Sequence, residues 1–598
     1  MSRPKPTHVY TGRRVLVLCL LGGAALLLMW RAVDLQVFNK AFLQVQGEAR
    51  HLRVVSLPVH RGVISDRNGE PLAISTPVDS VWANPQELAG ARAEWPRLAK
   101  LLDFSVKELA QFLDARMGRE FVYLKRRVTP GLAGQVMALK LPGVALQREY
   151  RRYYPSGEVT AHVVGFTGVE DNGQEGLELA YDAWLRGTPG SKRVMRDRLG
   201  RIVQDVEQLS APQPGRDVQL SLDRRIQYLA YRELKSAVLE HHALSGSAVI
   251  LDVQTGEVLA MVNVPAYNPN NPGEAQGARL RNRALTDVFE PGSTIKPFTI
   301  AAALETGQYR PDTPIDTAPG TFKVGHKLIR DMHDYGRIDI SAVIQKSSNV
   351  GASKIALTIP PEQMWRMFSS VGLGTQSGSG FPGEASGRLS SPRRWGEIER
   401  ATLSFGYGLS VTALQLAQAY TALANDGELR PVSLLRVDNP LPGKRVMQPG
   451  TATAVRAMME RVVADGGTGT QARIPGYRVA GKTGTVHKIG ADGYDANRYL
   501  SLFAGMAPAT RPRLVMAVII NEPQGDEYYG GLVAAPVFAK VLTGALRLLD
   551  VSPDDLPSLQ IAQSNTVRRE ELGVRRNSSS PLTPHPSPAE GPDMGKYE

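Results

Sequence analysis

The chain has 598 residues, a formal net charge of +12 and one cysteine, Cys19. A single cysteine excludes an intrachain disulfide and a cysteine-based metal site. The length predicts about three or four domains, and the ordinary apolar fraction predicts that most of the chain folds. The basic residues are spread along the chain, not gathered on one helix with interleaved aromatic side chains, so the charge does not indicate a nucleic-acid-binding protein.

An apolar segment without charged residues, 15–30, lies near the N-terminus. A helix of this length spans about 24 Å, and the next apolar residues extend it to a transmembrane anchor over 15–33. Residues 1–14 carry basic side chains and no acid, so the positive-inside rule keeps them cytoplasmic and exports the rest of the chain. A cleaved signal peptide is the alternative, but the segment ends without a small-x-small cleavage site.

Residues 37–215 mix short helix and strand signals and contain no catalytic pattern. We expect a helical stalk from Val37 that runs into a strand near Val55. Residues 60–69 alternate apolar and polar side chains and end in Asn-Gly, which predicts a hairpin. With a further helix expected over 106–116, we interpret this part as a positioning or docking module.

Residues 220–555 combine strand signals at both ends with a mostly helical insert between them. The predicted elements are a helix over 225–240, a hairpin of 246–253 with 257–264, strands at 477–486, 499–507 and 514–520, and a helix over 536–549. This order predicts an α+β fold, with an antiparallel sheet, helices on its faces and an α-helical subdomain beside it. Residues 557–598 lose apolar periodicity and are rich in serine and proline, so we expect them to be disordered.

The first of three chemically suggestive motifs is residues 293–296, Ser-Thr-Ile-Lys. Ser293 opens a helical run, where the positive end of the helix dipole stabilises developing negative charge. Lys296 follows at i+3, on the same face of the helix and within reach of that hydroxyl. A lysine acts as a base only if its pKa falls well below about 10.4, and both burial and a second cation, Lys482, would lower it.

The second motif is residues 347–349, Ser-Ser-Asn. Ser347 would relay a proton between Lys296 and a leaving amine, and Asn349 would hold a substrate amide with its donor and its acceptor. Taken alone, the three residues fit a helix-capping turn equally well, because Ser and Asn favour caps.

The third motif, residues 482–485, overlaps a phosphate-loop pattern. Residues 476–483 match G-x-x-x-x-G-K-[ST] in full. A phosphate loop follows a strand and opens a helix, whereas here 477–480 are strand-like and the residues after Lys482 continue extended. ATP is also not expected outside the membrane, so we interpret this segment as an edge strand and expect no nucleotide.

As an edge strand beside the nucleophile, the third motif suits a peptide that ends in a carboxylate. Lys482 and the hydroxyls of Thr483 and Thr485 would bind the carboxylate, and Gly484 would let the substrate lie close to the backbone. The N–H groups of Thr485 and Ser293 would form the oxyanion hole. In this order the three motifs predict acyl transfer from an amide through a serine acyl-enzyme, with no metal and no cofactor.

With these motifs and the anchor, the chain resembles the class B penicillin-binding proteins over about residues 10–555. The resemblance also covers residues 61–69, which read Arg-Gly-x-Ile-x-Asp-Arg-Asn-Gly, and four further segments: 289–293, 405–408, 528–531 and 535–538. The short anchor, the compact N-terminal module and the Tyr-Tyr-Gly-Gly segment are similar to the division-specific members of the family.

The resemblance implies a non-catalytic pedestal or dimerisation-like module over 37–215 and a transpeptidase domain over 220–555. It implies peptidoglycan stem peptides ending in D-Ala-D-Ala as substrates and β-lactams as inhibitors. Ser293 would attack the penultimate carbonyl, D-Ala would leave, and the amine of a neighbouring stem would resolve the acyl-enzyme.

The resemblance also implies an FtsW-like lipid II polymerase and other divisome proteins as partners. The location that it implies is the bacterial inner membrane at the division septum, with the catalytic domain in the periplasm.

Four alternatives remain at this stage. An elongation-type class B transpeptidase would share the motifs. A β-lactamase needs a way to deacylate with water, and no Glu-x-x-Leu-Asn lies between the second and third motifs. A D,D-carboxypeptidase would usually lack the large N-terminal module. A non-catalytic divisome scaffold would carry a lesion in at least one motif, and here all the key side chains are intact.

Overall fold

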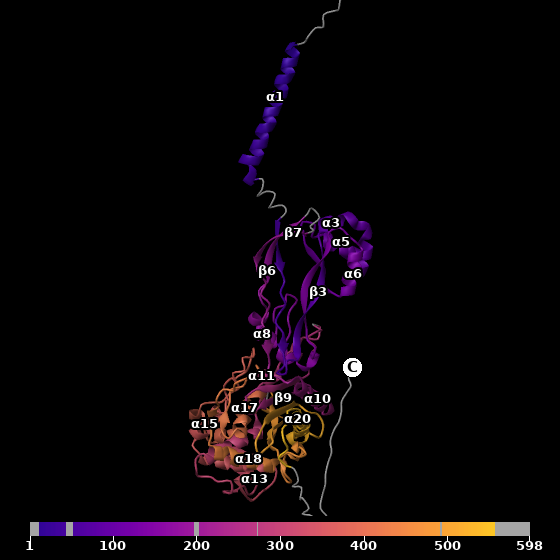
Figure 1. The fold of residues 1–598 in the computed structure, drawn as a ribbon. Coiled ribbons are helices and arrows are strands. Elements are labelled where there is room, and N and C mark those ends of the chain that lie inside the picture. The colour runs from indigo at the N-terminus through magenta and orange to yellow at the C-terminus, as the bar shows by residue number, and fades with distance from the viewer. Residues whose placement is uncertain (1–10, 43–51, 197–201, 272, 491–492, 556–598) are drawn as a thin grey trace, which may run out of the picture. The chain divides into compact units, whose positions relative to one another are not determined.

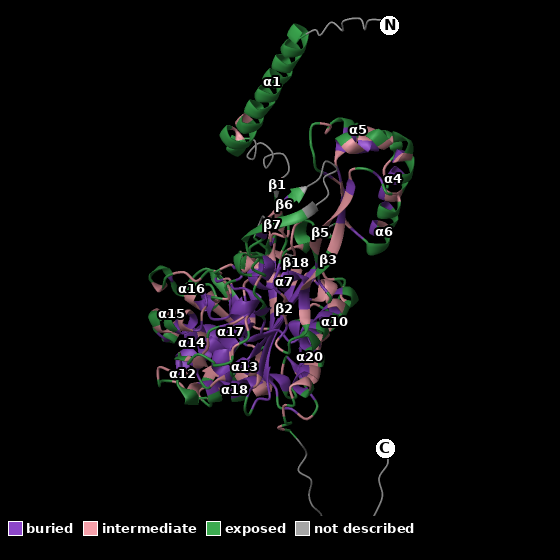
Figure 2. Ribbon diagram, turned by 45° about the horizontal axis from the view of Figure 1, so that its top comes forward, coloured by how far each residue is buried: buried purple, intermediate pink, exposed green. Residues whose placement is uncertain are grey.

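The computed structural model describes residues 11–42, 52–196, 202–271, 273–490 and 493–555 (Figure 1). The expected disorder of 557–598 and most of the stalk between Val37 and the first strand lie outside these ranges. Helix α1 (Thr11–Val33) covers the predicted anchor and begins four residues earlier; a short π-helical turn, Asp34–Phe38, follows it. This stretch is exposed almost throughout (Figure 2), and it is long and apolar enough for a single pass through a membrane.

The N-terminal module contains a five-stranded sheet in which β4-β3-β2-β8 follow one another and β5 pairs with β3. The strands are β2 (Ile64–Ser65), β3 (Pro71–Ala83), β4 (Val122–Val128), β5 (Val144–Tyr153) and β8 (Val218–Gln219). Helices α4 (Trp95–Leu102), α5 (Val106–Asp114) and α6 (Pro130–Ala138) share a buried cluster with this sheet. The helix expected over 106–116 is therefore α5, and it begins where Ser105 and Glu108 form a capping box.

A second sheet of this module has the order β1-β6-β7, with strands Leu52–Leu57, Gly190–Arg196 and Ile202–Ser210. Neighbouring strands in it are antiparallel. The short helices α7 (Ala161–Val164), α8 (Gly176–Ala180) and α9 (Asp182–Leu185) lie between β5 and β6 in the chain.

The hairpin at 60–69 is built as predicted and makes the junction with the second domain. The Asp66 carboxylate accepts the N–H groups of Asn68 and Glu70 in the turn, at 2.8 and 2.9 Å, and that of Arg224 at 3.0 Å. Arg224 begins helix α10 (Arg224–Glu240), so a buried aspartate of the N-terminal module satisfies one of the free N–H groups at the start of that helix.

The second domain is built on a five-stranded antiparallel sheet in the order β10-β9-β19-β18-β17. Its strands are β9 (Ser245–Asp252), β10 (Val258–Val264), β17 (Ala480–Gly490), β18 (Gly493–Ala507) and β19 (Leu514–Asn521). Helices α10 and α20 (Ala535–Leu548) pack against one another and against the sheet, and together they form one buried hydrophobic cluster. Helix α17 (Ala413–Ala424) packs against the sheet in a second buried hydrophobic cluster. With both faces covered, β9 and β10 are buried at every residue, which explains the apolar runs 248–251 and 258–262 within them.

The helical insert supplies the rest of this domain. Its main helices are α12 (Lys296–Leu304), α13 (Ile340–Lys346), α14 (Asn349–Thr358), α15 (Pro361–Ser370), α16 (Glu397–Leu403), α17 and α18 (Pro449–Val463). Helix α17 is buried along its whole length and is the centre of this subdomain. The mixed α+β class predicted from the sequence is therefore confirmed.

Candidate active site

Ser293 lies in a single 3-10 turn, Gly292–Ile295, that leads directly into α12. The residues on either side of it are buried, whereas Ser293 itself remains partly exposed. Gly292 has a φ of +53°, and a Cβ atom there would lie 2.3 Å from Cγ2 of Val486 in β17. Only glycine fits at this position, and it brings the nucleophile turn against the edge strand.

Lys296 is fully buried, and its ammonium points at the second motif. Nζ donates to the carbonyl oxygen and to Oγ of Ser347, at 2.5 and 3.2 Å, and to Oδ1 of Asn349 at 2.8 Å. These three bonds go to the second motif rather than to Ser293, and one of them reaches the Ser347 hydroxyl, which we expect to relay a proton.

Lys482 reaches the same hydroxyl from the edge strand. Its Nζ donates to Oγ of Ser347 at 2.8 Å, and it too is fully buried. Ser347 has a left-handed backbone with a φ of +61°, an unusual conformation for a residue other than glycine. In this conformation a single hydroxyl lies between two lysines that come from segments far apart in the sequence.

Burial controls the protonation of both lysines. It lowers the pKa of Lys296 to about 7, and the nearby carboxylate of Asp331 opposes part of this shift. Burial also lowers the pKa of Lys482 well below its ordinary value, and the charge of Lys296 lowers it further. The sequence predicts that burial and a second cation, Lys482, both lower the pKa of Lys296. Burial is the main cause in the structure, and the charge of one lysine acts on the pKa of Lys482.

The second motif is both a helix cap and part of the site. Ser348 caps α14 by accepting the N–H of Gly351 at 2.8 Å, while Ser347 and Asn349 bond to the lysines. Asn349 Nδ2 donates to the carbonyl of Arg330 at 3.1 Å, so both ends of its amide have protein partners here. The capping interpretation and the catalytic one therefore describe different residues of the same turn.

Sequence reasoning missed Asp331, which anchors this turn. Its carboxylate accepts the hydroxyl of Ser348 and the N–H of Asn349, both at 2.5 Å, and the N–H of Val350 at 3.0 Å. Three bonds from the start of one helix to one carboxylate are typical of an anion at a helix N-terminus. Asp331 lies in a loop between strand β13 (Lys327–Arg330) and β14 (Arg337–Asp339), and no local motif distinguishes it from other loop aspartates.

Lys482 to Thr485 lie inside β17, at the edge of the sheet, and the strand continues after them to Gly490. This is strand geometry, not that of a phosphate loop. The Thr483 hydroxyl bonds to that of Thr468 at 2.7 Å, and the Thr485 hydroxyl accepts the N–H of Gly530 at 3.0 Å. A Cβ atom on Gly484 would lie 3.1 Å from Thr294 and from Leu502, so this glycine also lets β17 pack beside the nucleophile turn.

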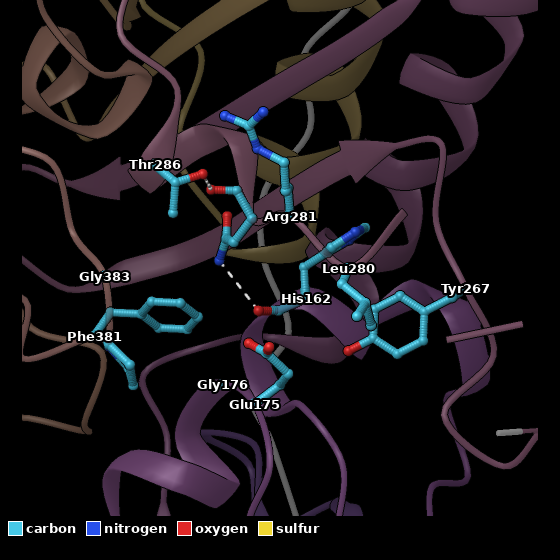
Figure 3. Close-up of a pocket in the computed structure, with 11 residues that line it drawn as sticks. His162, Glu175, Gly176, Tyr267, Leu280, Arg281, Thr286, Phe381 and Gly383 are labelled. Carbon is cyan, nitrogen blue, oxygen red and sulfur yellow. Dashed lines mark hydrogen bonds between the residues drawn. The ribbon is translucent and has the colours of Figure 1, made fainter. Parts of the chain in front are cut away.

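A cavity of about 250 Å³ lies away from these motifs, between helices α7 and α8 and the segments around Tyr267 and Phe381 (Figure 3). The pKa of His162 in its wall is lowered to about 4 because the ring is buried. Asn282 bonds to the backbone carbonyl of His162 at 3.1 Å, across the boundary between the two modules. None of the three motifs contributes to this cavity, so the candidate site is the lysine–serine cluster.

In the portions of the chain that the structure describes, no cluster of three or more His, Cys, Asp or Glu side chains is arranged to hold a metal ion. The reacting groups of the candidate site are instead a hydroxyl, two amines and backbone N–H groups. Such a set suits serine acyl transfer.

Comparison with known protein families identifies the class of protein to which this chain belongs. The family model described as penicillin binding protein transpeptidase domain matches residues 246–543, and the model described as penicillin-binding protein dimerisation domain matches residues 56–220. The fold and the site therefore define a penicillin-binding protein with a transpeptidase domain.

Curated relatives narrow this class. The chain is 45% identical over 543 residues to peptidoglycan D,D-transpeptidase FtsI of Escherichia coli K12, covering 90% of this chain and 92% of that protein. It is 45% identical over 530 residues to the probable peptidoglycan D,D-transpeptidase PenA of Neisseria meningitidis serogroup A, covering 88% and 91%.

Solved structures agree with this assignment. The transpeptidase domain of Burkholderia pseudomallei penicillin-binding protein 3 is 47% identical to this chain, with a TM-score of 0.53. The match covers 56% of this chain and 98% of the Burkholderia domain. A peptidoglycan synthetase from Bifidobacterium adolescentis is 26% identical with a TM-score of 0.68, covering 85% and 98%. The chain belongs to the class B penicillin-binding transpeptidases of the FtsI type.

Proposed function

We propose that the protein is a serine D,D-transpeptidase that cross-links peptidoglycan stem peptides during cell division. The observation that carries this proposal is the pair of buried lysines that both bond to Ser347, together with the partly exposed Ser293 in the turn that leads into α12. The names of the curated relatives, peptidoglycan D,D-transpeptidases, support the same substrate.

In the first half-reaction, neutral Lys296 takes the proton of Ser293, and Oγ attacks the carbonyl of the penultimate D-Ala. The N–H groups of Ser293 and Thr485 stabilise the oxyanion, while Lys482 and the threonine hydroxyls bind the terminal carboxylate. The C–N bond breaks, and Ser347 passes the proton from Lys296 to the departing amine of D-Ala. An ester on Ser293 and free D-Ala result.

In the second half-reaction, the amine of a neighbouring stem attacks the ester carbonyl. That amine loses a proton through Ser347 and Lys296, Ser293 leaves as the hydroxyl, and a new amide joins the two stems. The number of amide bonds is unchanged, so the exchange needs no ATP, as a site outside the cytoplasm requires. β-Lactams would acylate Ser293 in place of the stem peptide.

The location and the partners form part of this proposal. Helix α1 would anchor the protein in the inner membrane, with residues 1–14 in the cytoplasm and the transpeptidase domain in the periplasm, at the septum. Residues 37–215 and the anchor would contact an FtsW-like lipid II polymerase and other divisome proteins.

The test is labelling of the full-length protein in detergent by a fluorescent penicillin, with Ser293→Ala as the matched control. A label that depends on Ser293 and persists for hours supports the transpeptidase. A label that forms and is quickly lost means that water resolves the acyl-enzyme and that the protein is a hydrolase. The absence of label in folded protein would leave a non-catalytic scaffold.

A further inference from the structure

Glu290, three residues before Ser293, carries a charge that the mechanism above does not use. The carboxylate is partly buried, and Oε1 accepts the N–H of Gly408 at 2.8 Å. Both carboxylate oxygens lie 3.1 Å from the hydroxyl of Tyr494. In the described parts of the chain, no lysine, arginine or histidine forms a salt bridge with it.

The burial of this carboxylate is only partly compensated. Burial raises the pKa of Glu290, and the bonds from Gly408 and Tyr494 and the charge of Lys327 offset only part of that effect. The carboxylate has four lone-pair directions, and a hydrogen bond from a cation is worth more to it than one from a neutral group. A cation supplied from outside would therefore bind here favourably.

The position of Glu290 along β17 indicates which part of a substrate would meet it. Tyr494 pairs with Ile489, near the end of β17, whereas Lys482 and Thr483 lie near its start. A peptide with its terminal carboxylate at Lys482 must run antiparallel to β17 if it adds to this free edge of the sheet. Its residues before the scissile D-Ala then lie toward the Tyr494 end.

Aromatic side chains lie close to the Glu290 carboxylate. The rings of Tyr407 and Tyr494 meet edge to face with centroids 5.3 Å apart, and Phe405 packs on Tyr407 in the same way at 5.7 Å. Aromatic rings beside a carboxylate are typical surroundings for an ammonium group.

The proposed reaction itself requires an amine on the stem. The acceptor is the amine of a neighbouring stem, and since the stems of one polymer are alike, a donor stem carries the same amine. That amine is protonated while free and becomes a neutral amide once it has been cross-linked.

We infer that Glu290 binds the free, protonated side-chain amine of the donor stem and makes the enzyme prefer donors that have not yet served as acceptors. This inference rests on the proposed transpeptidase function. Glu290 is thus a specificity-determining residue on the donor side of Ser293, and the ligand that it recognises is a primary ammonium on the residue before the D-Ala pair.

The experiment uses two synthetic donors, each an acyl-L-lysyl-D-alanyl thioester of thioglycolate, with the lysine amine either free or N-acetylated. Attack by Ser293 releases thioglycolate, and its thiol is measured with the full-length protein in detergent. We expect kcat/KM to be about tenfold higher for the free-amine donor than for the acetylated donor, because the free amine adds about one charge-assisted hydrogen bond in the transition state. A ratio near one in the wild-type protein would overturn the inference without any variant.

Glu290→Gln removes the charge but keeps an acceptor for Gly408. We expect this variant to lower the ratio of the two kcat/KM values, free amine over acetylated, to about one. The fall should come from a lower kcat/KM for the free-amine donor, while kcat/KM for the acetylated donor changes by no more than about twofold. Tyr494→Phe keeps the charge and should keep the ratio. An unchanged ratio in Glu290→Gln that still binds fluorescent penicillin would contradict the inference. If neither donor releases thiol faster with wild type than with Ser293→Ala, the proposed function itself fails.

Discussion

Lys296 and Lys482 are both fully buried, and both donate to the hydroxyl of Ser347. Burying two ammonium groups side by side is costly, because each loses its hydration and each repels the other. Burial therefore lowers the pKa of both lysines, which favours the neutral amine that a base requires.

The pKa of Lys296, about 7, predicts how acylation depends on pH. The neutral amine is the active base, so the rate should rise about tenfold per pH unit below that pKa and level off above it. Stopped-flow measurement of acylation by a penicillin between about pH 5 and pH 8 checks this. A rate that is flat across the range would mean that Lys296 is not the titrating base.

Asp331 holds the turn that presents Ser347 and Asn349. We expect Asp331→Asn to slow acylation by about tenfold and to lower the free energy of unfolding by about 1 to 3 kcal/mol, because a neutral amide replaces a carboxylate that accepts three bonds. Penicillin acylation kinetics and urea unfolding measure the two effects. Asp334→Asn, in the same loop, is the control, since Asp334 bonds only within that loop, to the N–H of Gly336.

At the scale of elements, the site depends on close contact between the nucleophile turn and its neighbours. A Cβ atom on Gly406, in the segment between α16 and α17, would lie 2.1 Å from the carbonyl oxygen of Gly292. From α17, the hydroxyl of Tyr420 donates to the carbonyl of Thr294 at 2.7 Å. Helix α17 thus contacts the backbone after Ser293, and the segment before that helix contacts the backbone ahead of Ser293.

The junction between the β2–β3 turn and α10 gives a prediction at the same scale. Asp66→Ala leaves three backbone N–H groups and the Asn68 side-chain amide without this acceptor, so we expect the free energy of unfolding to fall by about 2 to 4 kcal/mol. Urea unfolding measures it. Glu70→Gln breaks an exposed ion pair with Arg224 in the same turn and should cost less than about 1 kcal/mol. Equal losses in the two variants would contradict the capping role.

At the scale of the whole molecule, anchoring and chemistry reside in separate parts of the chain. Helix α1 is exposed along its length and contributes no residue to the cluster around Ser347. Removal of residues 1–38 should therefore release the protein from sedimented vesicles, while its rate of acylation by penicillin stays within about twofold of the full chain. A tenfold loss of acylation rate would show that the anchor supports the active domain.

The sequence by itself predicted the main elements and the residues of the candidate site. Apolar runs predicted the sheet strands and the anchor, because burial on both faces of a sheet or in lipid favours apolar side chains. The three motifs predicted Ser293, Lys296, Ser347, Asn349 and Lys482 as one site, and the structure brings the last four into direct contact. The roles of all five in catalysis remain predictions.

Only the tertiary structure decided the contacts that span long separations in the chain. Asp331, Tyr420 and Gly406 lie in segments with no motif, and their importance comes from what packs against them. Hydrogen bonds and close approach act over a few ångströms in space, whereas sequence patterns register neighbours within a few residues along the chain. The protonation of the two lysines was likewise decided by burial, which follows from the packing of the whole domain.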